Sequence, residues 1–298
     1  VYARDAGIRE KGLPLRGDLV GISATQALGE PVTQSSLGSK HKGGSAAGGP
    51  SGFKYLQMLA TAPEESPWWA THSQKAGVVQ GIRPAPAGGF IVTVNGEDHT
   101  TSPDAVPTVK VGDTVDDGDE LSNGLSNPNE LVKFKGIGEG RRQYLRAMQG
   151  AFTANKIQAN RRNVELMARG MINHVRMTDE HGDWLPDDVV PYDRVEAGWK
   201  PRPGTYAQPV DRSAGRYLEK PVLHYTIGTK LTKKMADEIG EFGIKNVDVH
   251  DTPPPFQPEF VSGSDTLLYD PDWQTRMLGS NQQKATLDAA WRGLSSDE

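Results

Sequence analysis

The sequence predicts an irregular α+β fold. Apolar residues recur at helical spacing before and after a middle stretch, and that stretch consists of short β-branched runs separated by turn residues. The composition is also loop-rich, because the 298 residues include 34 glycines and 21 prolines and have a mean hydropathy of −0.57. With 36% hydrophobic residues, the chain can bury one or two ordinary cores. We therefore expect several elements to pack against neighbouring chains of a larger assembly.

Charge and residue usage limit the classes of protein to which this chain can belong. The formal net charge is −5, so any binding of nucleic acid has to come from local basic clusters. The absence of cysteine excludes disulfides and thiolate metal sites. No apolar run is long enough to span a bilayer, and the first residues carry no secretory pattern. Because the chain starts at Val1 without a methionine, we expect it to be a piece of something longer.

The first element is a short helix that leads into a polar segment. Neither glycine nor proline interrupts the pattern from Ile22 to Leu28, and Pro31 ends it because proline cannot donate to the helix ladder. Residues 33–42 are polar, with lysines on both sides of His41. The glycine, serine and alanine tract at 43–52 cannot hold one conformation unaided. A cationic, histidine-bearing segment beside such a hinge suits closure over a phosphate-bearing ligand.

A second helix and a β-rich stretch follow. Residues 52–60 have apolar positions at mostly helical spacing, and prolines follow them. Residues 76–123 are β in character, as the run at 89–94 shows, and the Asn95-Gly96 pair after it is the strongest hairpin-turn signal available.

An acidic cluster within this stretch invites a metal-site interpretation. Its members are Asp113, Asp116, Asp117 and Asp119. Carboxylates beside glycines are what exposed turns ordinarily contain, and the spacing does not follow a calcium-binding loop. We therefore expect turns here and no metal bound by this chain.

Two amphipathic helices are expected between residues 140 and 177. The first carries an apolar stripe made of Tyr144, Leu145, Met148 and Phe152. The second carries a stripe at i, i+3, i+7 and i+11, made of Val164, Met167, Met171 and Val175. Asn160 can cap the second helix.

Three arginines of the second helix are the predicted nucleic-acid-binding residues: Arg161, Arg162 and Arg169. The alternative for most of them is an ordinary solvated helix face.

From residue 184 onward, regular helix and strand patterns are fewer. There we expect a proline-rich linker at 201–210, a short helix at 231–242, irregular structure at 252–258 and a terminal helix within 276–293.

The stretch at 17–44 resembles the trigger-loop region of β′, the largest subunit of multisubunit DNA-directed RNA polymerases, whose signature reads roughly VGxxAAQSIGEPxTQxTxxTFHxGG. The match runs in one register without gaps. It covers Val20, Gly21, Ala24, Gln26, Gly29, Glu30, Pro31, Thr33, Gln34, His41, Gly43 and Gly44.

Further blocks resemble β′ in the same order along the chain. Residues 144–183 keep part of a long β′ helical pattern, namely Tyr144, Leu145, Glu165, Arg169, Met171, Val175, Thr178, Asp179, Gly182 and Asp183. Residues 109–124 resemble the hairpins of sandwich-barrel hybrid domains, and residues 276–293 weakly resemble a later β′ helix.

The resemblance implies an architecture. It consists of a trigger-loop helical hairpin, a small β-rich jaw region like a sandwich-barrel hybrid, and a helix pair, all packed into a larger multisubunit assembly. The expected boundaries are 1–62 for the linker and trigger-loop region, 63–130 for the jaw-like region, 131–183 for the helix pair, and 184–298 for a loop-rich C-terminal region with a terminal helix.

The resemblance also implies a function, in which the trigger loop closes over an incoming nucleoside triphosphate and promotes nucleotidyl transfer. His41 would be the catalytic residue at the phosphates, Gln34 would bind the ribose and Leu37 would pack against the base. The chain departs from the family at Gly38 and Lys40, so Lys40 is expected to take over phosphate neutralisation.

The chain has no stretch like the NADFDGD loop that holds the catalytic Mg²⁺ in this family. The resemblance therefore implies that Mg²⁺ is held by another part of the polymerase and that the chain is not active alone. The expected partners are an N-terminal β′ part carrying the catalytic aspartates, β-like subunits, template DNA, RNA and nucleoside triphosphates. A specificity factor and packaging in a virion stay open, and no membrane is involved.

Separate encoding of the two β′ halves, the missing cysteines and the divergence favour a bacteriophage polymerase acting in the bacterial host cytoplasm, with an unusual cellular or organellar enzyme as the alternative. The alternative function is a non-catalytic scaffold or transcription-regulator module built on a hybrid-barrel domain.

Overall fold

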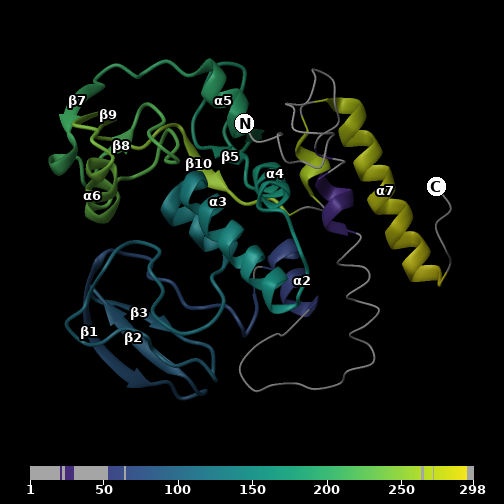
Figure 1. The fold of residues 1–298 in the computed structure, drawn as a ribbon, viewed down its shortest axis with the longest axis horizontal. Coiled ribbons are helices and arrows are strands. Elements are labelled where there is room, and N and C mark those ends of the chain that lie inside the picture. Colours follow the sequence, from purple (N-terminus) through teal and green to yellow (C-terminus); the bar gives the residue numbers. More distant parts are fainter. Residues whose placement is uncertain are drawn as a thin grey trace.

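The computed structural model describes residues 21, 24–29, 53–63, 65–262, 265–270 and 272–293. They form a mixed α+β structure, which confirms the predicted fold class (Figure 1). In this part of the chain, no helix has the length and apolar character needed to cross a membrane.

Helices flank the predicted loop segment on both sides. Gly21 and residues 24–29 are helical, and helix α2 spans Phe53–Thr61, so both predicted helices are confirmed where they are described. Leu28 from the first helix and Leu59 from α2 belong to the same buried core. The described elements before and after residues 30–52 therefore share one core.

The β-rich stretch forms one antiparallel sheet in the order β3-β2-β1-β4, curled at the lower left of Figure 1. Its strands are β1 Gly77–Pro84, β2 Phe90–Val94, β3 Glu97–Thr100 and β4 Thr114–Val115. Asn95 and Gly96 have φ of 48° and 80° and join β2 to β3, which confirms the predicted hairpin. The sheet has its own small core, made of Val79, Val92, Val94, Val115 and Leu121.

The acidic cluster is used in turns and ion pairs. The carboxylate of Asp119 lies 2.7 Å from Lys135 Nζ, and that of Asp117 lies 2.8 Å from Lys230 Nζ. Asp113 accepts a hydrogen bond from the backbone N–H of Lys110 within its own turn. These carboxylates therefore tie the sheet region to the elements packed beside it.

The helix pair consists of α3, Pro128–Ala154, and α4, Arg161–Met171. Helix α3 is two helices joined at a kink, because Gly136 has φ 84° and ψ 171°. The Asn160 side chain accepts a hydrogen bond from the Arg162 N–H at 2.9 Å, so the predicted cap is confirmed.

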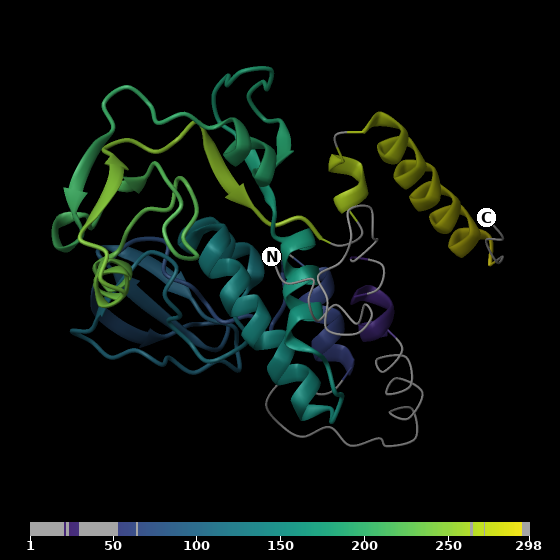
Figure 2. The same cartoon turned by 45° about the horizontal axis from the view of Figure 1, so that its top comes forward.

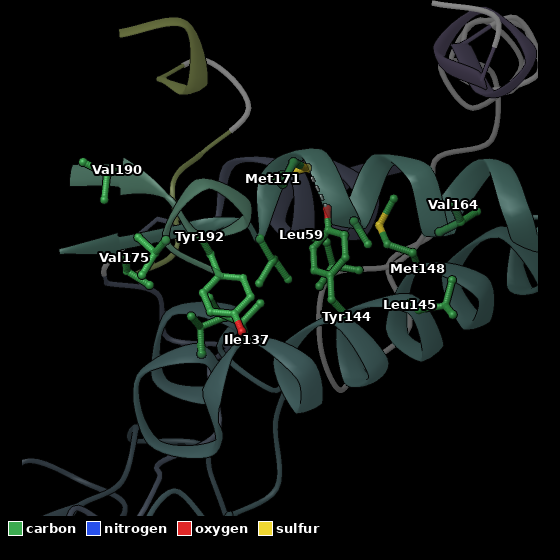
Figure 3. Close-up of a cluster of buried hydrophobic side chains, with 14 of the residues drawn as sticks. Leu59, Ile137, Tyr144, Leu145, Met148, Val164, Met171, Val175, Val190 and Tyr192 are labelled. Carbon is green, nitrogen blue, oxygen red and sulfur yellow. Dashed lines mark hydrogen bonds between the residues drawn. The ribbon is translucent and has the colours of Figure 1, made fainter. Parts of the chain in front are cut away.

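The main core lies where α3, α4 and the following strands meet (Figure 3). The predicted stripe on α3 is confirmed, since all four of its residues are buried: Tyr144, Leu145, Met148 and Phe152. The Tyr144 hydroxyl donates to Met171 Sδ at 3.4 Å and links the two helices. The stripe on α4 is wrong at its end, because the helix stops at Met171 and the buried Val175 lies in a strand.

The C-terminal half adds two three-stranded antiparallel sheets, in the orders β10-β5-β6 and β7-β9-β8. The first consists of β5 His174–Met177, β6 Val189–Pro191 and β10 Phe256–Glu259. The second consists of β7 Tyr206–Pro209, β8 Tyr217–Leu218 and β9 Asn246–His250. Helix α5 (Tyr192–Gly198) follows β6, the 3₁₀ turn η2 (Val210–Arg212) follows β7, and the 3₁₀ turn η3 (Thr266–Tyr269) follows β10.

Two predictions for this half are wrong. Residues 252–258 were expected to be irregular and 201–210 to be a linker, yet β10 begins at Phe256 and β7 spans Tyr206–Pro209. Both strands lie at the edge of their sheets, where a proline removes no hydrogen bond from the interior of the ladder.

The two remaining helices, α6 and α7, differ in their position relative to the other elements. Helix α6, Lys233–Glu241, confirms the expected short helix and packs its apolar face into a second core with Leu231 and Val249. Helix α7, Trp273–Arg292, confirms the terminal helix and lies to one side of the other elements in both views (Figures 1 and 2).

Candidate nucleic-acid interface

A groove of about 700 Å³ runs along α3. Helix α4 forms one wall, and the segment 221–226 together with α6 forms the other. The same arrangement is visible in Figure 1, where α3 lies between α6 and α4. Five arginines and three glutamates line the groove: Arg141, Arg142, Arg146, Arg161, Arg169, Glu165, Glu196 and Glu238. The groove is therefore basic in a chain whose net charge is −5.

Helical periodicity brings the α3 residues of the groove together. Positions 138, 141, 142, 145 and 149 follow the i, i+3, i+4, i+7, i+11 pattern of one helix face. Gly138 allows the opposite wall to approach, because a Cβ there would lie 1.8 Å from the backbone oxygen of His224. The segment 221–226 thus packs against the backbone of α3.

Arg141 is held by hydrogen bonds at the C-terminal end of α4. Its Nε donates to the Ile172 carbonyl at 2.7 Å, and its Nη2 donates to Asn173 Oδ1 at 2.8 Å. Burial, and then the positive charge of Arg169, lower the pKa of Arg141 to about 10. The guanidinium is still charged at neutral pH and adds a fixed positive charge to the groove.

Arg142 belongs to a charged network that joins α3 to the opposite wall. Its Nη1 lies 2.7 Å from Glu238 Oε1 and 3.6 Å from Glu139 Oε2. The other oxygen of Glu238 accepts from the Tyr225 hydroxyl at 2.8 Å, and Glu139 lies 3.1 Å from His224 Nε2.

The network shifts the protonation of its carboxylates. Burial raises the pKa of Glu139, but hydrogen bonds from His224 and Gln143 outweigh it and the net shift is downward. In Glu238 burial is likewise outweighed, by hydrogen bonds from Tyr225 and Arg142, and the pKa is lowered. Both carboxylates are therefore ionised at neutral pH and hold Arg142 in place.

The remaining arginines face the open side of the groove. Arg161 pairs with Glu165 across one helical turn, at 3.0 Å. Arg146 and Arg169 are exposed, and within the described residues neither has a hydrogen bond or an ion pair. Among the described residues these two arginines have no ion pair with a carboxylate, and neither has Arg141, whose partners are a carbonyl and an amide oxygen.

The wall opposite α4 has an apolar rim. Phe242 follows the last turn of α6 and is 67% exposed. Leu223 is 47% exposed and has φ of +55°, a left-handed conformation that is uncommon for a branched apolar residue. The groove thus combines arginines on its floor and one wall with exposed apolar side chains on the other.

The predicted site residues divide into two groups. Gln34, Leu37, Lys40 and His41 lie outside the described residues. Of the predicted nucleic-acid contacts, Arg161 and Arg169 line the groove, whereas Arg162 is half-buried and does not. Sequence reasoning missed Arg141, Arg142 and Arg146, although their spacing on one face of α3 could have indicated them.

The chain is similar to curated β′ subunits of DNA-directed RNA polymerase. It is 32% identical to the subunit of Ligilactobacillus salivarius over 182 residues, which is 58% of this chain and 15% of that protein. It is 29% identical to that of a Thermoanaerobacter species over 222 residues, or 69% of this chain and 18% of the relative. For Pelotomaculum thermopropionicum the identity is 33% over 173 residues, or 56% of this chain and 14% of the relative. No protein-family model matches.

These similarities identify the chain as a relative of the large subunits of DNA-directed RNA polymerases. They support the resemblance to the C-terminal region of β′ that was found in the sequence. The match spans less than a fifth of the curated relatives' length.

Proposed function

We propose that the chain is the C-terminal β′ portion of a DNA-directed RNA polymerase and that its segment 17–52 acts as the trigger loop. The observation that carries the proposal is the similarity to β′ subunits over as much as 69% of the chain. The ungapped trigger-loop signature, which includes Gln34 and His41, adds the specific role.

The described helices on either side of residues 30–52 support the role. Leu28 before these residues, and Leu56 and Leu59 after them, are buried in the core that also holds the α3 and α4 stripes. A segment whose two ends are anchored in one core can change conformation between them without loss of the fold. This is the arrangement that a loop closing over a substrate requires.

In the proposed mechanism the loop positions the nucleotide and neutralises charge. Gln34 hydrogen-bonds the ribose, Leu37 packs against the base and His41 lies at the phosphates as an electrostatic or acid catalyst. Lys40 supplies a second positive charge there. Closure expels water and completes the site only when the correct nucleotide is bound.

Among the described residues, no three carboxylate or histidine side chains are grouped so that they could hold an ion. In our proposal, Mg²⁺ is held by aspartates in an N-terminal β′ part. That part, β-like subunits, template DNA, RNA and nucleoside triphosphates are the proposed partners, and a bacteriophage origin with action in the host cytoplasm is part of the proposal.

Nucleotide addition on a preassembled RNA:DNA scaffold tests the proposal. With the complex that co-purifies with the chain, we expect His41→Ala and Gln34→Ala to slow addition about 100-fold or more at unchanged scaffold affinity, since a positioned acid contributes about 10²–10⁴-fold. Gln158→Ala, an exposed glutamine outside the segment, is the matched control and is expected to have the wild-type rate.

Wild-type rates in both loop variants would contradict the trigger-loop role. They would favour the second function, a non-catalytic scaffold or regulator. The observation that speaks for this alternative is the separate curled sheet, which has its own core and could serve as a binding module.

A further inference from the structure

The groove along α3 has an unbalanced positive charge. Arg141 and Arg142 are fixed by their hydrogen bonds, while Arg146 and Arg169 line the groove, are exposed and have no ion pair among the described residues. Like charges that are held together cost free energy, and a bound anion would offset this cost. The ligand chemistry that fits several arginines at once is the phosphate group.

The apolar rim opposite these arginines is suited to stacking against a nucleic-acid base. Phe242 is 67% exposed and lines the groove, as do Leu223 and Pro221. An aromatic side chain beside a basic groove is the combination that binds single strands, because the arginines follow the backbone and the ring stacks on a base. In a duplex the bases are stacked inside, so only a single strand can offer one to Phe242.

From these two features we propose that the groove binds a single-stranded segment of nucleic acid, with phosphates on Arg146 and Arg169 and a base stacked on Phe242. The inference rests on the proposed polymerase function, which supplies such strands. It differs from that function in its location, since every residue named here lies outside segment 17–52.

The test is fluorescence anisotropy with the full chain and three probes of equal length: a single-stranded oligothymidine, the same backbone without bases, and a duplex. We expect the single strand to bind more tightly than the duplex. Phe242→Ala is expected to weaken binding of the oligothymidine about 5- to 100-fold and to leave binding of the abasic strand unchanged.

The arginines are tested through the salt dependence of binding. For the Arg146→Ala/Arg169→Ala double variant, the slope of log K against log salt is expected to fall by about 1.4, or roughly 0.7 for each lost phosphate contact. The matched control is Arg83→Ala/Arg212→Ala, which removes two exposed arginines outside the groove and is expected to keep the wild-type slope. Circular dichroism checks that all variants are folded.

Three results would overturn the inference: no binding of any probe by the folded chain, equal binding of duplex and single strand, or groove variants that bind like the wild type. The nucleotide-addition assay separates this failure from failure of the trigger-loop role. If only the inference fails, the groove variants bind like the wild type while His41→Ala still slows addition. If only the trigger-loop role fails, His41→Ala has the wild-type rate while the groove variants lose strand binding.

Discussion

At the scale of single residues, a glycine of α3 allows the opposite wall of the groove to pack closely. Gly138 and Gly150 both lie in α3, but their surroundings are opposite. A Cβ at Gly138 would meet the backbone of His224, whereas a Cβ at Gly150 would have nothing within 4 Å. The first glycine is needed for a close approach of two backbones, and the second is only an entropic cost to the helix.

This contrast predicts that replacing the two glycines with alanine changes the free energy of unfolding in opposite directions. Gly138→Ala is expected to lower the free energy of unfolding by about 1–3 kcal/mol, because the segment 221–226 must move. Gly150→Ala is expected to raise it by about 0.5–1 kcal/mol. Urea denaturation of both variants measures the difference, and a stabilised Gly138→Ala variant would show that the wall does not pack as described.

Structural features that depend only on neighbouring residues could be predicted from the sequence. The Asn95-Gly96 turn and the Asn160 cap depend only on nearby backbone, and both are confirmed. The kink at Gly136 was not predicted, and its tertiary surroundings include Thr229, whose hydroxyl oxygen would lie 3.0 Å from a Cβ at that position. Contacts between residues so far apart in the chain leave no local pattern.

At the scale of elements, α4 carries two of the groove arginines, and its first turn depends on Asn160. Asn160→Ala is expected to lower the free energy of unfolding by about 1 kcal/mol, because the Arg162 N–H loses its acceptor. Asn160→Asp keeps an acceptor oxygen and is expected to remain near the wild type. Equal losses in the two variants, measured by urea denaturation, would mean that the side chain acts through something other than the cap.

Element prediction failed where tertiary position overrides local preference. Prolines made residues 201–210 and 252–258 look irregular, but β7 and β10 lie at sheet edges and tolerate them. The groove was only half predicted for a similar reason. Arg161 and Arg169 were chosen from the sequence of α4, whereas the opposite wall comes from residues 221–242, which no pattern placed beside α3.

At the scale of the whole molecule, a single charged network joins the α3 helix to the α6 core. Glu139 and Arg142 come from α3, Glu238 comes from α6, and His224 lies in the segment between β8 and α6. The network is partly buried, so its charges are less screened than those of exposed pairs. Protonation of its carboxylates should therefore loosen the contact between these two parts.

The pKa shifts give the sign of this effect. The pKa values of Glu139 and Glu238 are lower in the folded chain than their ordinary value of 4.5. The stability that they contribute is fully present above that ordinary value and is lost as the pH falls through the lowered folded pKa values. We expect the free energy of unfolding to fall on acidification below about pH 5, and the Glu139→Gln/Glu238→Gln variant to show a smaller fall.

Urea denaturation between pH 3 and pH 7 measures this dependence. Glu130→Gln/Glu241→Gln is the matched control, because it removes two carboxylates from α3 and α6 for which no ion pair is found among the described residues. If both double variants follow the wild-type pH profile, the network does not couple the two parts. A flatter profile in the network variant alone would mean that the wall of the groove is held to α3 by these charges, and strand binding should then weaken over the same pH range.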